Sequence, residues 1–343
     1  MYKLNRFVFI TLGNYTCTMT KFNSEENTIS NYFTIAFYNL ENLFDVFNDK
    51  YTNDDAFLPN SERNWTPKRY KKKVRKLGYA ISKVGIKTAK KLPTIVGLAE
   101  VENKLVIEDL LKSKFLKNHN YDIVHYDSPD ERGIDVAMIY NKDNFEVIRS
   151  EVYELDLTMK NGIPDHTRDV LVVLGLINGE AIYLVMNHWP SRREGQELTE
   201  PKRIMASNKV IEVLNNIKTE DPNAKIIVMG DFNDDPKSKS IKQLVQQHDL
   251  YNPMESLMSF NRGSLNHLLR WNLFDQILFS TNFFEFDREK HAFSKANIFD
   301  KEFLKQFKGK YKGSPFRTYV GRKYKGGYSD HFPVYIHLKK GNT

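Results

Sequence analysis

The sequence predicts an α/β domain whose β-sheets are covered by helices on one side and by a second sheet on the other. Three observations predict it: several short strand-like segments, two long segments with helical periodicity, and no internal repeat or long linker after residue 31. Some strand-like segments alternate apolar and polar residues, whereas others are continuously apolar. A strand buried on both faces gives the second pattern, so the mixture favours stacked sheets.

Eight segments are predicted to be strands because they are rich in β-branched and aromatic residues and are bounded by turn formers. They are Phe33–Tyr38, Thr94–Leu98, Ile134–Tyr140, Val170–Ile177, Ala181–Met186, Lys225–Met229, Phe274–Phe279 and Phe332–Leu338. The long connections near residues 45–65, 252–272 and 308–327 carry aromatic and cationic residues, which is typical of ordered loops that line a binding surface.

Two helices are predicted from apolar residues at spacings of three and four. The first begins at the N-cap Thr66 with Pro67 as its first helical residue and continues to Val84. The second covers Glu197–Thr219. The first helix also carries Lys68, Arg69, Lys71, Lys72, Lys73, Arg75 and Lys76, which we interpret as a solvated outer face.

Composition limits the class of protein. The chain has 343 residues, of which 41% are hydrophobic, so a disordered or collagen-like chain is excluded. Its net charge of +8 favours a polyanionic partner. The single cysteine, Cys17, excludes an intramolecular disulfide and a cysteine-rich zinc site, so a metal would bind oxygen and imidazole ligands. No apolar run approaches the roughly 18 residues of a membrane-spanning helix.

The N-terminus is predicted to lie outside the fold. Residues 1–31 are expected to be a poorly ordered leader, and residues 32–340 a single domain, most simply a monomer. Lys3 and Arg6 precede the short apolar stretch Phe7–Leu12, but no small-residue cleavage site follows. We therefore expect a cytoplasmic protein, with export through a degenerate signal as the open alternative.

Acidic, amide and imidazole side chains gather at the ends of the predicted strands. Such groups are held rigidly and converge on one rim, which suits a catalytic site. Carboxylates without thiols make a hard-oxygen site, for which Mg²⁺ or Mn²⁺ is best suited. The residues at these strand ends are Asn39, Glu41, Glu100, His188, Asp231, Asn233, Asp275, Asp330 and His331.

Together the strand-end motifs resemble the endonuclease/exonuclease/phosphatase superfamily over roughly residues 33–338. A single pentapeptide is a weak signal, but six in the family order are a strong one. They are Tyr-Asn-Leu-Glu-Asn (38–42), Ala-Glu-Val-Glu-Asn (99–103), Asn-His-Trp-Pro-Ser (187–191), Gly-Asp-Phe-Asn-Asp (230–234), Phe-Asp-Gln-Ile-Leu (274–278) and Ser-Asp-His-Phe-Pro (329–333). The resemblance implies a four-layer α/β sandwich, with two mixed β-sheets packed face to face, helices on the outside and catalytic residues at one end.

The resemblance also implies metal ligands. Glu100 is similar to the principal ligand, and Glu41 and Asp330 would help directly or through water. Asn39 would lie beside the metal and the phosphate. Glu102 we interpret as a solvated neighbour of Glu100.

The remaining site residues resemble groups that act on the phosphate and on water. Asp231 is similar to the residue that positions or deprotonates the attacking water, and Asn233 would hold a phosphate oxygen. His331, oriented by Asp275, would contact the scissile phosphate. His188 is similar to a histidine that would act as the general acid for the leaving oxygen.

Four further side chains lie outside this set. Arg168 resembles a phosphate-contacting arginine of the nuclease branch. Asp135 could orient His188 or be an ordinary strand residue. Arg317 and Tyr319 could touch substrate or hold a loop.

The predicted activity is metal-dependent phosphodiester hydrolysis, as an endonuclease or exonuclease acting on nucleic acid. The alternative is a phosphatase or phospholipase-C-type hydrolase of phosphoinositide or sphingomyelin. Against it, the inositol phosphatase signature is absent around Asp275, and the sequence shows no obvious apolar hairpin for membrane insertion. A non-catalytic phosphate-binding module is the third reading, which the intact set of acids disfavours.

Overall fold

The computed structural model describes residues 30–158, 162, 164–285 and 287–341. The predicted leader, except its last two residues, and Cys17 lie outside this part of the chain. Within it, no helix is long and apolar enough to cross a lipid bilayer.

The first sheet has six strands in the order β15-β18-β1-β2-β4-β3. In this sheet β1 and β2 are parallel, and every other neighbouring pair is antiparallel. The strands are β1 (Tyr32–Leu43), β2 (Ile95–Val101), β3 (Tyr121–His125), β4 (Asp135–Asn141), β15 (His291–Ile298) and β18 (Val334–Lys340).

The second sheet also has six strands, in the order β11-β14-β10-β9-β8-β5. Here β9 and β10 are the parallel pair, and the other neighbours are antiparallel. The strands are β5 (Phe145–Tyr153), β8 (Val170–Ile177), β9 (Glu180–His188), β10 (Ile226–Asp231), β11 (Leu250–Tyr251) and β14 (Asp275–Ser280).

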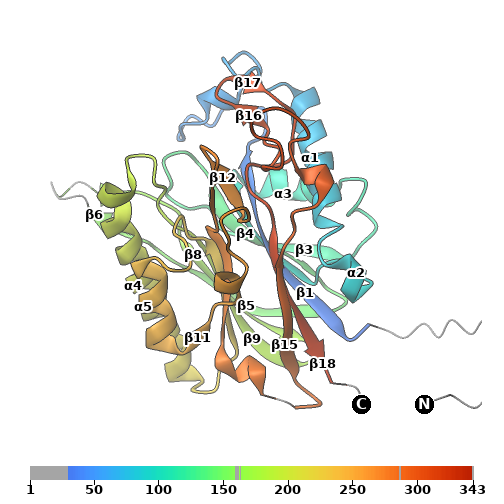
Figure 1. Ribbon diagram of the computed structural model, residues 1–343, viewed down its shortest axis with the longest axis vertical. Helices are drawn as coiled ribbons and strands as arrows, with labels where there is room; N and C mark the ends of the chain where they lie inside the picture. The colour runs from blue at the N-terminus through green and yellow to red at the C-terminus, as the bar shows by residue number, and fades with distance from the viewer. Residues whose placement is uncertain (1–29, 159–161, 163, 286, 342–343) are drawn as a thin grey trace, which may run out of the picture.

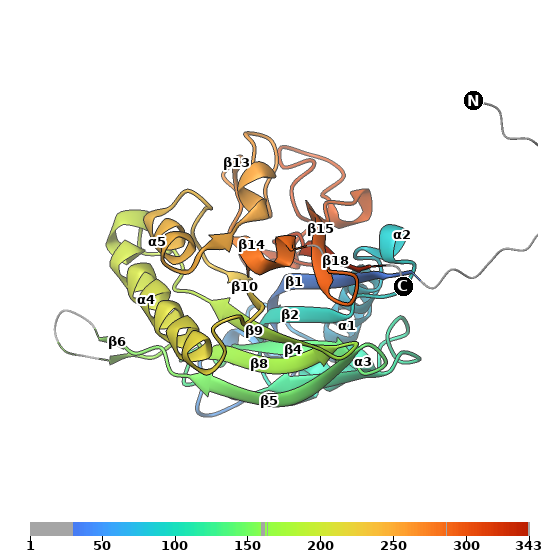
Figure 2. The ribbon, with the colours of Figure 1, turned by 90° about the horizontal axis from the view of Figure 1, so that it is seen from below.

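Helices cover the outer faces of both sheets, and Figure 2 shows the resulting layers. On the outside of the first sheet are α1 (Pro67–Ile81), α2 (Ile86–Ala89) and α3 (Lys104–Leu111). On the outside of the second are α4 (Gln196–Glu220) and α5 (Lys239–His248). The predicted four-layer α/β sandwich is confirmed.

Short elements connect the layers. Three two-stranded hairpins are β6 (Leu157–Thr158) with β7 (Pro164–Asp165), β12 (Leu265–His267) with β13 (Arg270–Asn272), and β16 (Tyr319–Val320) with β17 (Lys323–Tyr324). The 3₁₀ helices are η1 (Asp55–Phe57), η2 (Pro253–Ser256), η3 (Thr281–Phe284) and η4 (Glu302–Leu304).

Burial on both faces explains the continuously apolar strands. In β10, Ile227 and Met229 belong to the core between the sheets, whereas Ile226 and Val228 pack in a second cluster with residues of α4. Because successive side chains of a strand point to opposite faces, both sets must be apolar. All eight predicted strands are present within a few residues of their expected bounds, and α1 ends at Ile81 rather than Val84.

An ion-pair cluster joins the two sheets through Glu180 at the start of β9. Its carboxylate lies 2.7 Å from Lys225 Nζ and 2.6 Å from His291 Nδ1, and His291 belongs to β15 of the other sheet. Burial alone would raise the pKa of Glu180, but hydrogen bonds from His291 and Lys225 outweigh it and lower the pKa to about 2.

We expect Glu180→Gln to lower the free energy of unfolding at neutral pH by on the order of 3 kcal/mol, because it leaves the buried ammonium of Lys225 without its carboxylate. The lowered pKa means that the carboxylate stabilises the native protein fully above pH 4.5 and loses this effect as pH falls towards 2. Urea unfolding of both proteins at several pH values checks this. A difference that stays constant from pH 7 to pH 3 would contradict it.

Candidate active site

The strand ends that carry the predicted site residues lie at one end of the sandwich, the upper end in Figure 1. Asn39 and Glu100 lie near the carboxyl ends of the parallel strands β1 and β2, and His188 and Asp231 end the parallel strands β9 and β10. Because β14 runs antiparallel to β10, its first residue, Asp275, pairs with Asp231 at the same end. The fold therefore brings together residues that are far apart in the sequence.

Several site residues have a strained backbone. Glu41, Asn42, Glu100 and Asn233 have φ angles of 53°, 53°, 60° and 49°, a region that non-glycine residues rarely adopt. The pairing register of β1 with β2 shifts between Asn39 and Leu43, where the chain bulges. Such conformations cost roughly 1–3 kcal/mol each and concentrate at functional sites. This strain marks the same strand ends that the motifs indicate.

Asp231 lies at the centre of the site. Its Oδ2 accepts a hydrogen bond of 2.9 Å from Asn39 Nδ2, and its Oδ1 accepts one of 3.0 Å from the backbone N–H of Asn233. His188 Nε2 and His331 Nε2 are each 3.9 Å from Asp231 Oδ2. Burial raises the pKa of Asp231 to about 6, although His331 opposes the rise. A carboxylate with such a pKa is well matched to accepting a proton near neutral pH.

Asp275 holds His331 as the resemblance implies. The Nδ1 of His331 is 2.6 Å from Asp275 Oδ2, and both residues are buried. Burial alone would lower the pKa of His331, but Asp275 and Asp231 outweigh it and raise the pKa well above its usual value. The ring is therefore a fixed imidazolium whose Nε2 is free to donate to an anion.

His188 lies in a different environment from the one that its predicted role requires. Its Nδ1 is buried and has no hydrogen-bond partner in the part of the chain that the structure describes. Burial, reinforced by the positive charges of Arg168 and Arg132, lowers the pKa of His188 well below its usual value. A neutral ring suits a hydrogen-bonding role, so this environment does not favour the predicted proton donor.

Among the three predicted metal ligands, Glu100 and Asp330 line a cleft, whereas Glu41 does not. The carboxylate of Glu41 accepts hydrogen bonds from the backbone N–H groups of Thr318 and Tyr319, and Arg317 Nε lies 3.5 Å from it. Arg317 also donates to Asp330 at 2.6 Å. Glu41 thus supports the loop and the arginine that hold Asp330.

Lys73 is a site residue that the sequence analysis missed. It is 2% exposed, and its Nζ donates to the backbone carbonyl of Glu41 at 2.5 Å and to Thr318 Oγ1 at 2.7 Å. The interpretation of all α1 cations as a solvated face is therefore wrong for Lys73. Lys68, Lys71, Lys72 and Arg75 are exposed as expected. Helical spacing offers a signal that could have found it, because Lys73 lies three residues after Tyr70 and four before Leu77, at the edge of the buried stripe. Its partners, in contrast, lie on segments distant in the sequence.

Two of the residues predicted to contact the phosphate, Arg168 and Asn233, make hydrogen bonds within the protein. Arg168 donates to Asp130 at 3.0 Å and to the carbonyl of Trp189 at 2.8 Å. Asn233 Nδ2 donates to the same carbonyl at 2.9 Å. Asn233 lines the cleft, whereas Arg168 lines a neighbouring hollow.

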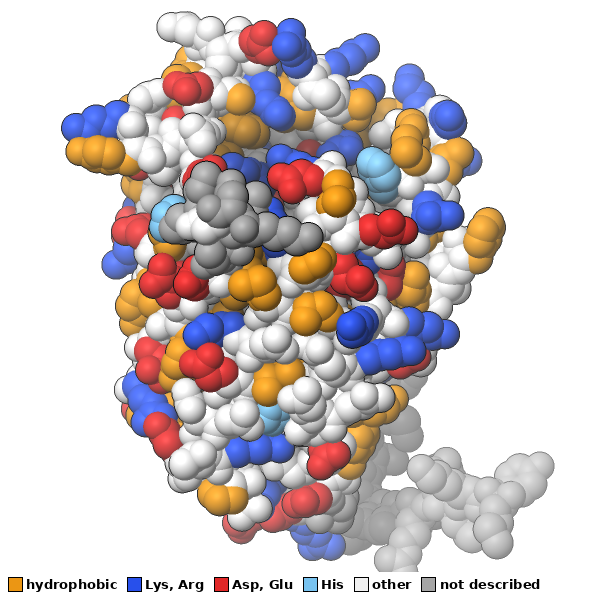
Figure 3. All heavy atoms as spheres, turned by 90° about the vertical axis from the view of Figure 1, so that its left-hand side faces the viewer, with side chains coloured by type: hydrophobic (Ala, Val, Ile, Leu, Met, Phe, Trp, Pro, Cys, Tyr) orange, Lys and Arg blue, Asp and Glu red, His pale blue; other side chains and the backbone are white. Residues whose placement is uncertain are grey.

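The catalytic cleft, as we call the hollow above Asp231, has a volume of about 600 Å³. Its acids are Glu100, Asp231 and Asp330, and five arginines surround them: Arg132, Arg192, Arg193, Arg270 and Arg317. Figure 3, which views the molecule from the α4 side, shows Lys and Arg side chains recessed in its upper half. Acids encircled by arginines suit a cation and a polyanion bound together.

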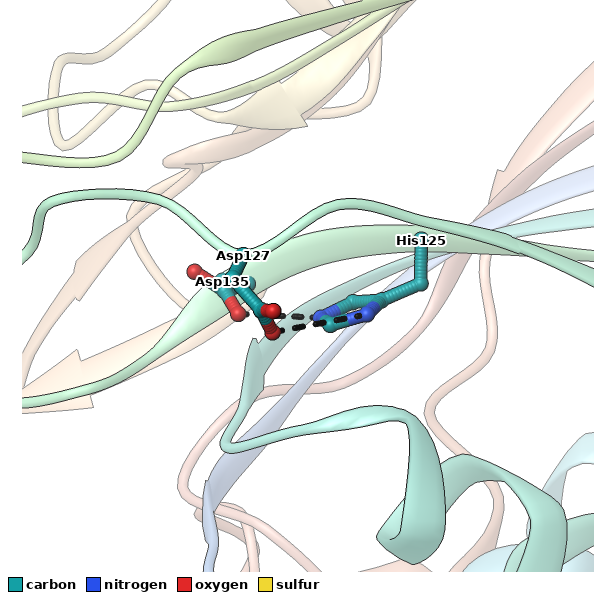
Figure 4. Close-up of side chains that lie close together, drawn as sticks. All are labelled: His125, Asp127 and Asp135. Atoms are coloured by element: carbon teal, nitrogen blue, oxygen red, sulfur yellow. Dashed lines mark hydrogen bonds and ion pairs between the residues drawn. The ribbon is translucent and has the colours of Figure 1, made fainter. Parts of the chain in front are cut away.

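Two alternatives from the sequence are corrected by the structure. Asp135 does not orient His188, because its carboxylate is 2.9 Å from His125 Nε2 (Figure 4). The same carboxylate also accepts hydrogen bonds from Ser128. Glu102 is not a solvated neighbour of Glu100. It is partly buried, accepts a hydrogen bond from the backbone N–H of Asp45, and has a pKa that burial raises to about 8.

Residues 34–340 match the model of the endonuclease/exonuclease/phosphatase family. The chain belongs to this family. No curated protein matches the sequence. Solved structures with the same fold include an endonuclease/exonuclease/phosphatase family protein from Bacteroides thetaiotaomicron, which is 17% identical with 90% of this chain and 95% of that chain covered and a TM-score of 0.54.

Two further family structures have comparable similarity. Humanized D. rerio TDP2 is 15% identical, with 92% of this chain and 100% of that chain covered and a TM-score of 0.55. Mannosyl-6-phosphatase Bt3783 of Bacteroides thetaiotaomicron VPI-5482 is 17% identical, with 89% and 99% covered and a TM-score of 0.54. At these identities the likeness shows the shared fold.

The carboxylates that line the cleft are suitable ligands for a divalent cation. Glu100 Oε2 accepts a hydrogen bond from the Asn42 backbone at 2.7 Å, which fixes the carboxylate and leaves its other oxygen without a donor among the described residues. Asp330 is fixed in the same way by Arg317. Oriented carboxylates without thiols suit Mg²⁺ or Mn²⁺. Among the described residues, the ligand atoms at this end of the sandwich that lie within 4.8 Å of one another are those of Asp231, Asp275 and His331, a group that includes neither Glu100 nor Asp330.

Proposed function

We propose that this protein is a divalent-metal-dependent phosphodiesterase that cleaves nucleic acid by attack of water on phosphorus. The observation that carries the proposal is the catalytic cleft, in which a buried carboxylate and an imidazolium adjoin two oriented acids within a ring of arginines. Each of these groups has a task in phosphodiester hydrolysis, because the substrate is an anion that repels its nucleophile.

Each cleft residue has a defined role in the proposal. Glu100 and Asp330 hold the Mg²⁺ or Mn²⁺ ion, with Glu41 supporting Asp330 through Arg317. The bound ion would stabilise negative charge on the phosphoryl oxygens. Asp231, kept in place by Asn39, orients the attacking water and accepts its proton.

The imidazolium of His331 donates its Nε2–H to a non-bridging oxygen while Asp275 keeps the ring fixed. His188 and Asn233 line the same cleft and donate hydrogen bonds to the phosphate. Arg168 acts from behind the cleft by fixing the Trp189 carbonyl, to which Asn233 also donates.

A substrate panel tests the proposal. Wild type and Asp231→Asn are compared on plasmid DNA, abasic duplex, RNA, bis(p-nitrophenyl) phosphate, mannose 6-phosphate and a phosphoinositide, each with Mg²⁺ and with excess chelator. We expect metal-dependent cleavage of a nucleic acid that Asp231→Asn abolishes. Turnover confined to the sugar phosphate or the phosphoinositide would reject the nuclease assignment and keep the phosphoesterase.

Two cleft arginines are predicted to contact substrate phosphates. The guanidinium groups of Arg193 and Arg270 make no hydrogen bond or ion pair within the described residues and line the cleft. Each Arg→Gln change should reduce the slope of log affinity against log salt by about 0.9 for duplex DNA. The matched controls are Lys71→Gln and Lys72→Gln on the exposed face of α1, which should leave the slope unchanged. Fluorescence anisotropy between 50 and 200 mM salt measures the slopes.

Equal slopes for wild type and both arginine variants would remove Arg193 and Arg270 from the interface. Flattened slopes in the α1 controls would move the contact surface to α1.

A further inference from the structure

The β12–β13 hairpin forms one wall of the catalytic cleft and ends in an exposed apolar tip. Leu268 and Leu269 are 74% and 52% exposed. The sequence shows no obvious apolar hairpin for membrane insertion, but the structure has an exposed apolar turn here. The hairpin projects from the sandwich on the same side as the loop after β15 (Figure 2).

The tip is strained as well as exposed. Leu268 and Leu269 have φ angles of 49° and 68°, and they are the two central residues of the turn that joins His267 to Arg270. Positive φ at both central positions is the geometry of a type I′ turn, which asparagine and glycine adopt far more readily than leucine. Leucine at both positions therefore sacrifices local stability, and an observed outlier of this kind points to a function.

The tip borders a second hollow that adjoins the catalytic cleft. Five apolar side chains line it, including Phe260, which is fully exposed, and Trp271. Arg270 lines both this hollow and the cleft, and Lys237 adds a second cation. An anion bound in the cleft would therefore lie beside Arg270. On the other side of Arg270 is an apolar surface with an exposed aromatic ring.

The hairpin is also tied to the catalytic centre. Leu265 of β12 pairs with His331 through their backbones, and Trp271 of β13 stacks on Phe332 with 6.0 Å between the ring centroids. The hollow and the imidazolium that faces the phosphate thus keep a fixed spacing. A group attached to the bound phosphate is the occupant that this arrangement suits, since a bilayer would cover the tip without entering the hollow.

We infer that this hollow receives an unpaired nucleobase next to the scissile phosphate, so that the enzyme prefers single-stranded or locally unpaired nucleic acid. The inference rests on the proposed function and names its substrate class. Phe260 offers a face for stacking, Leu268 and Leu269 close the side of the hollow, and Arg270 contacts the adjoining phosphate. Duplex DNA keeps its bases paired and stacked, so it gains nothing from the hollow.

Binding measured in excess chelator tests the inference without turnover. Fluorescein-labelled 12-nucleotide single strands and the duplex of the same sequence are titrated with the full chain, with Phe260→Ser, and with the double variant Leu268→Asn/Leu269→Gly. Loss of a stacked base corresponds to a weakening of about fivefold or more. We expect wild type to prefer the single strand by at least that factor and both variants to lose the preference. Phe307→Ser removes an exposed phenylalanine outside the hollow and is the matched control.

The Leu268→Asn/Leu269→Gly variant is informative even if Phe260→Ser folds poorly. It removes the backbone strain of the turn and should therefore raise the thermal unfolding midpoint. An unchanged single-strand preference in both variants overturns the inference and leaves the proposed function standing. Failure of wild type to bind either nucleic acid in chelator, together with failure to bind or cleave either one once Mg²⁺ is restored, contradicts the proposed function itself. A third arm uses phosphatidylserine–phosphatidylcholine vesicles. Vesicle binding lost in the variants, with single-strand binding retained, would overturn the inference and assign the tip to a lipid surface.

Discussion

Asp275→Asn and His331→Asn should each lower turnover by roughly 10²- to 10⁴-fold, the range for a positioned hydrogen-bond donor to a developing anion. The reason is the 2.6 Å contact between Asp275 Oδ2 and His331 Nδ1. Through this contact Asp275 acts on the phosphate only by holding His331 in place. When two residues perform one function together, the loss of either residue already removes that function. The double variant should therefore be little slower than the poorer single variant.

Single-turnover rates on all four members of this cycle, with the folded fraction measured by thermal unfolding, check the expectation. Asp275 is completely buried, so its substitution also tests whether the residue is merely structural. In that case turnover per folded molecule would be unaffected by Asp275→Asn. Multiplicative losses in the double variant would show that the two residues act separately.

Glu100→Gln should abolish measurable Mg²⁺ binding and lower activity by at least about 100-fold. The substitution keeps the size of the side chain but removes the charge from a cleft carboxylate that the Asn42 backbone N–H orients. Isothermal titration with Mg²⁺ gives a readout that does not depend on turnover. Glu102→Gln is the matched control, because Glu102 lies two residues away and contacts the Asp45 backbone rather than the cleft.

If Glu100→Gln bound Mg²⁺ as tightly as wild type, the cation would have to bind to other residues of the site. The alternative place is the group formed by Asp231, Asp275 and His331. Asp231→Asn would then be the variant that loses Mg²⁺ binding, and the roles proposed for Asp231 and Glu100 would be exchanged.

The central strands could be predicted from the sequence, and the edge strands could not. Strands β9 and β10 are buried on both faces, so their apolar runs stand out. Strands β5 and β15 lie at sheet edges and expose several polar side chains, including Glu146 and Lys295. Their patterns therefore resemble those of surface loops. Helix α3 was missed although Asn103 caps it, because its eight residues are too few for a clear period.

Some residues of the site could likewise be predicted from the sequence, and others could not. Motif residues such as Asp231 and His331 follow strands that local patterns identify, so their convergence could be predicted. Four of the arginines that line the cleft come from loops and Arg270 comes from the short β12–β13 hairpin, and in such segments an arginine has no distinguishing pattern. Lys73 reaches Glu41 and Thr318 across 32 and 245 residues of sequence, and such contacts exist only in the folded chain.

The most direct test of the account is the rate of single-stranded DNA cleavage by chelator-treated enzyme before and after Mg²⁺ is restored, for wild type and Asp231→Asn. The account predicts no cleavage by wild type in chelator, full recovery with Mg²⁺, and no recovery for a folded Asp231→Asn protein. Cleavage that persists in excess chelator, or that Asp231→Asn retains at the wild-type rate, would contradict it.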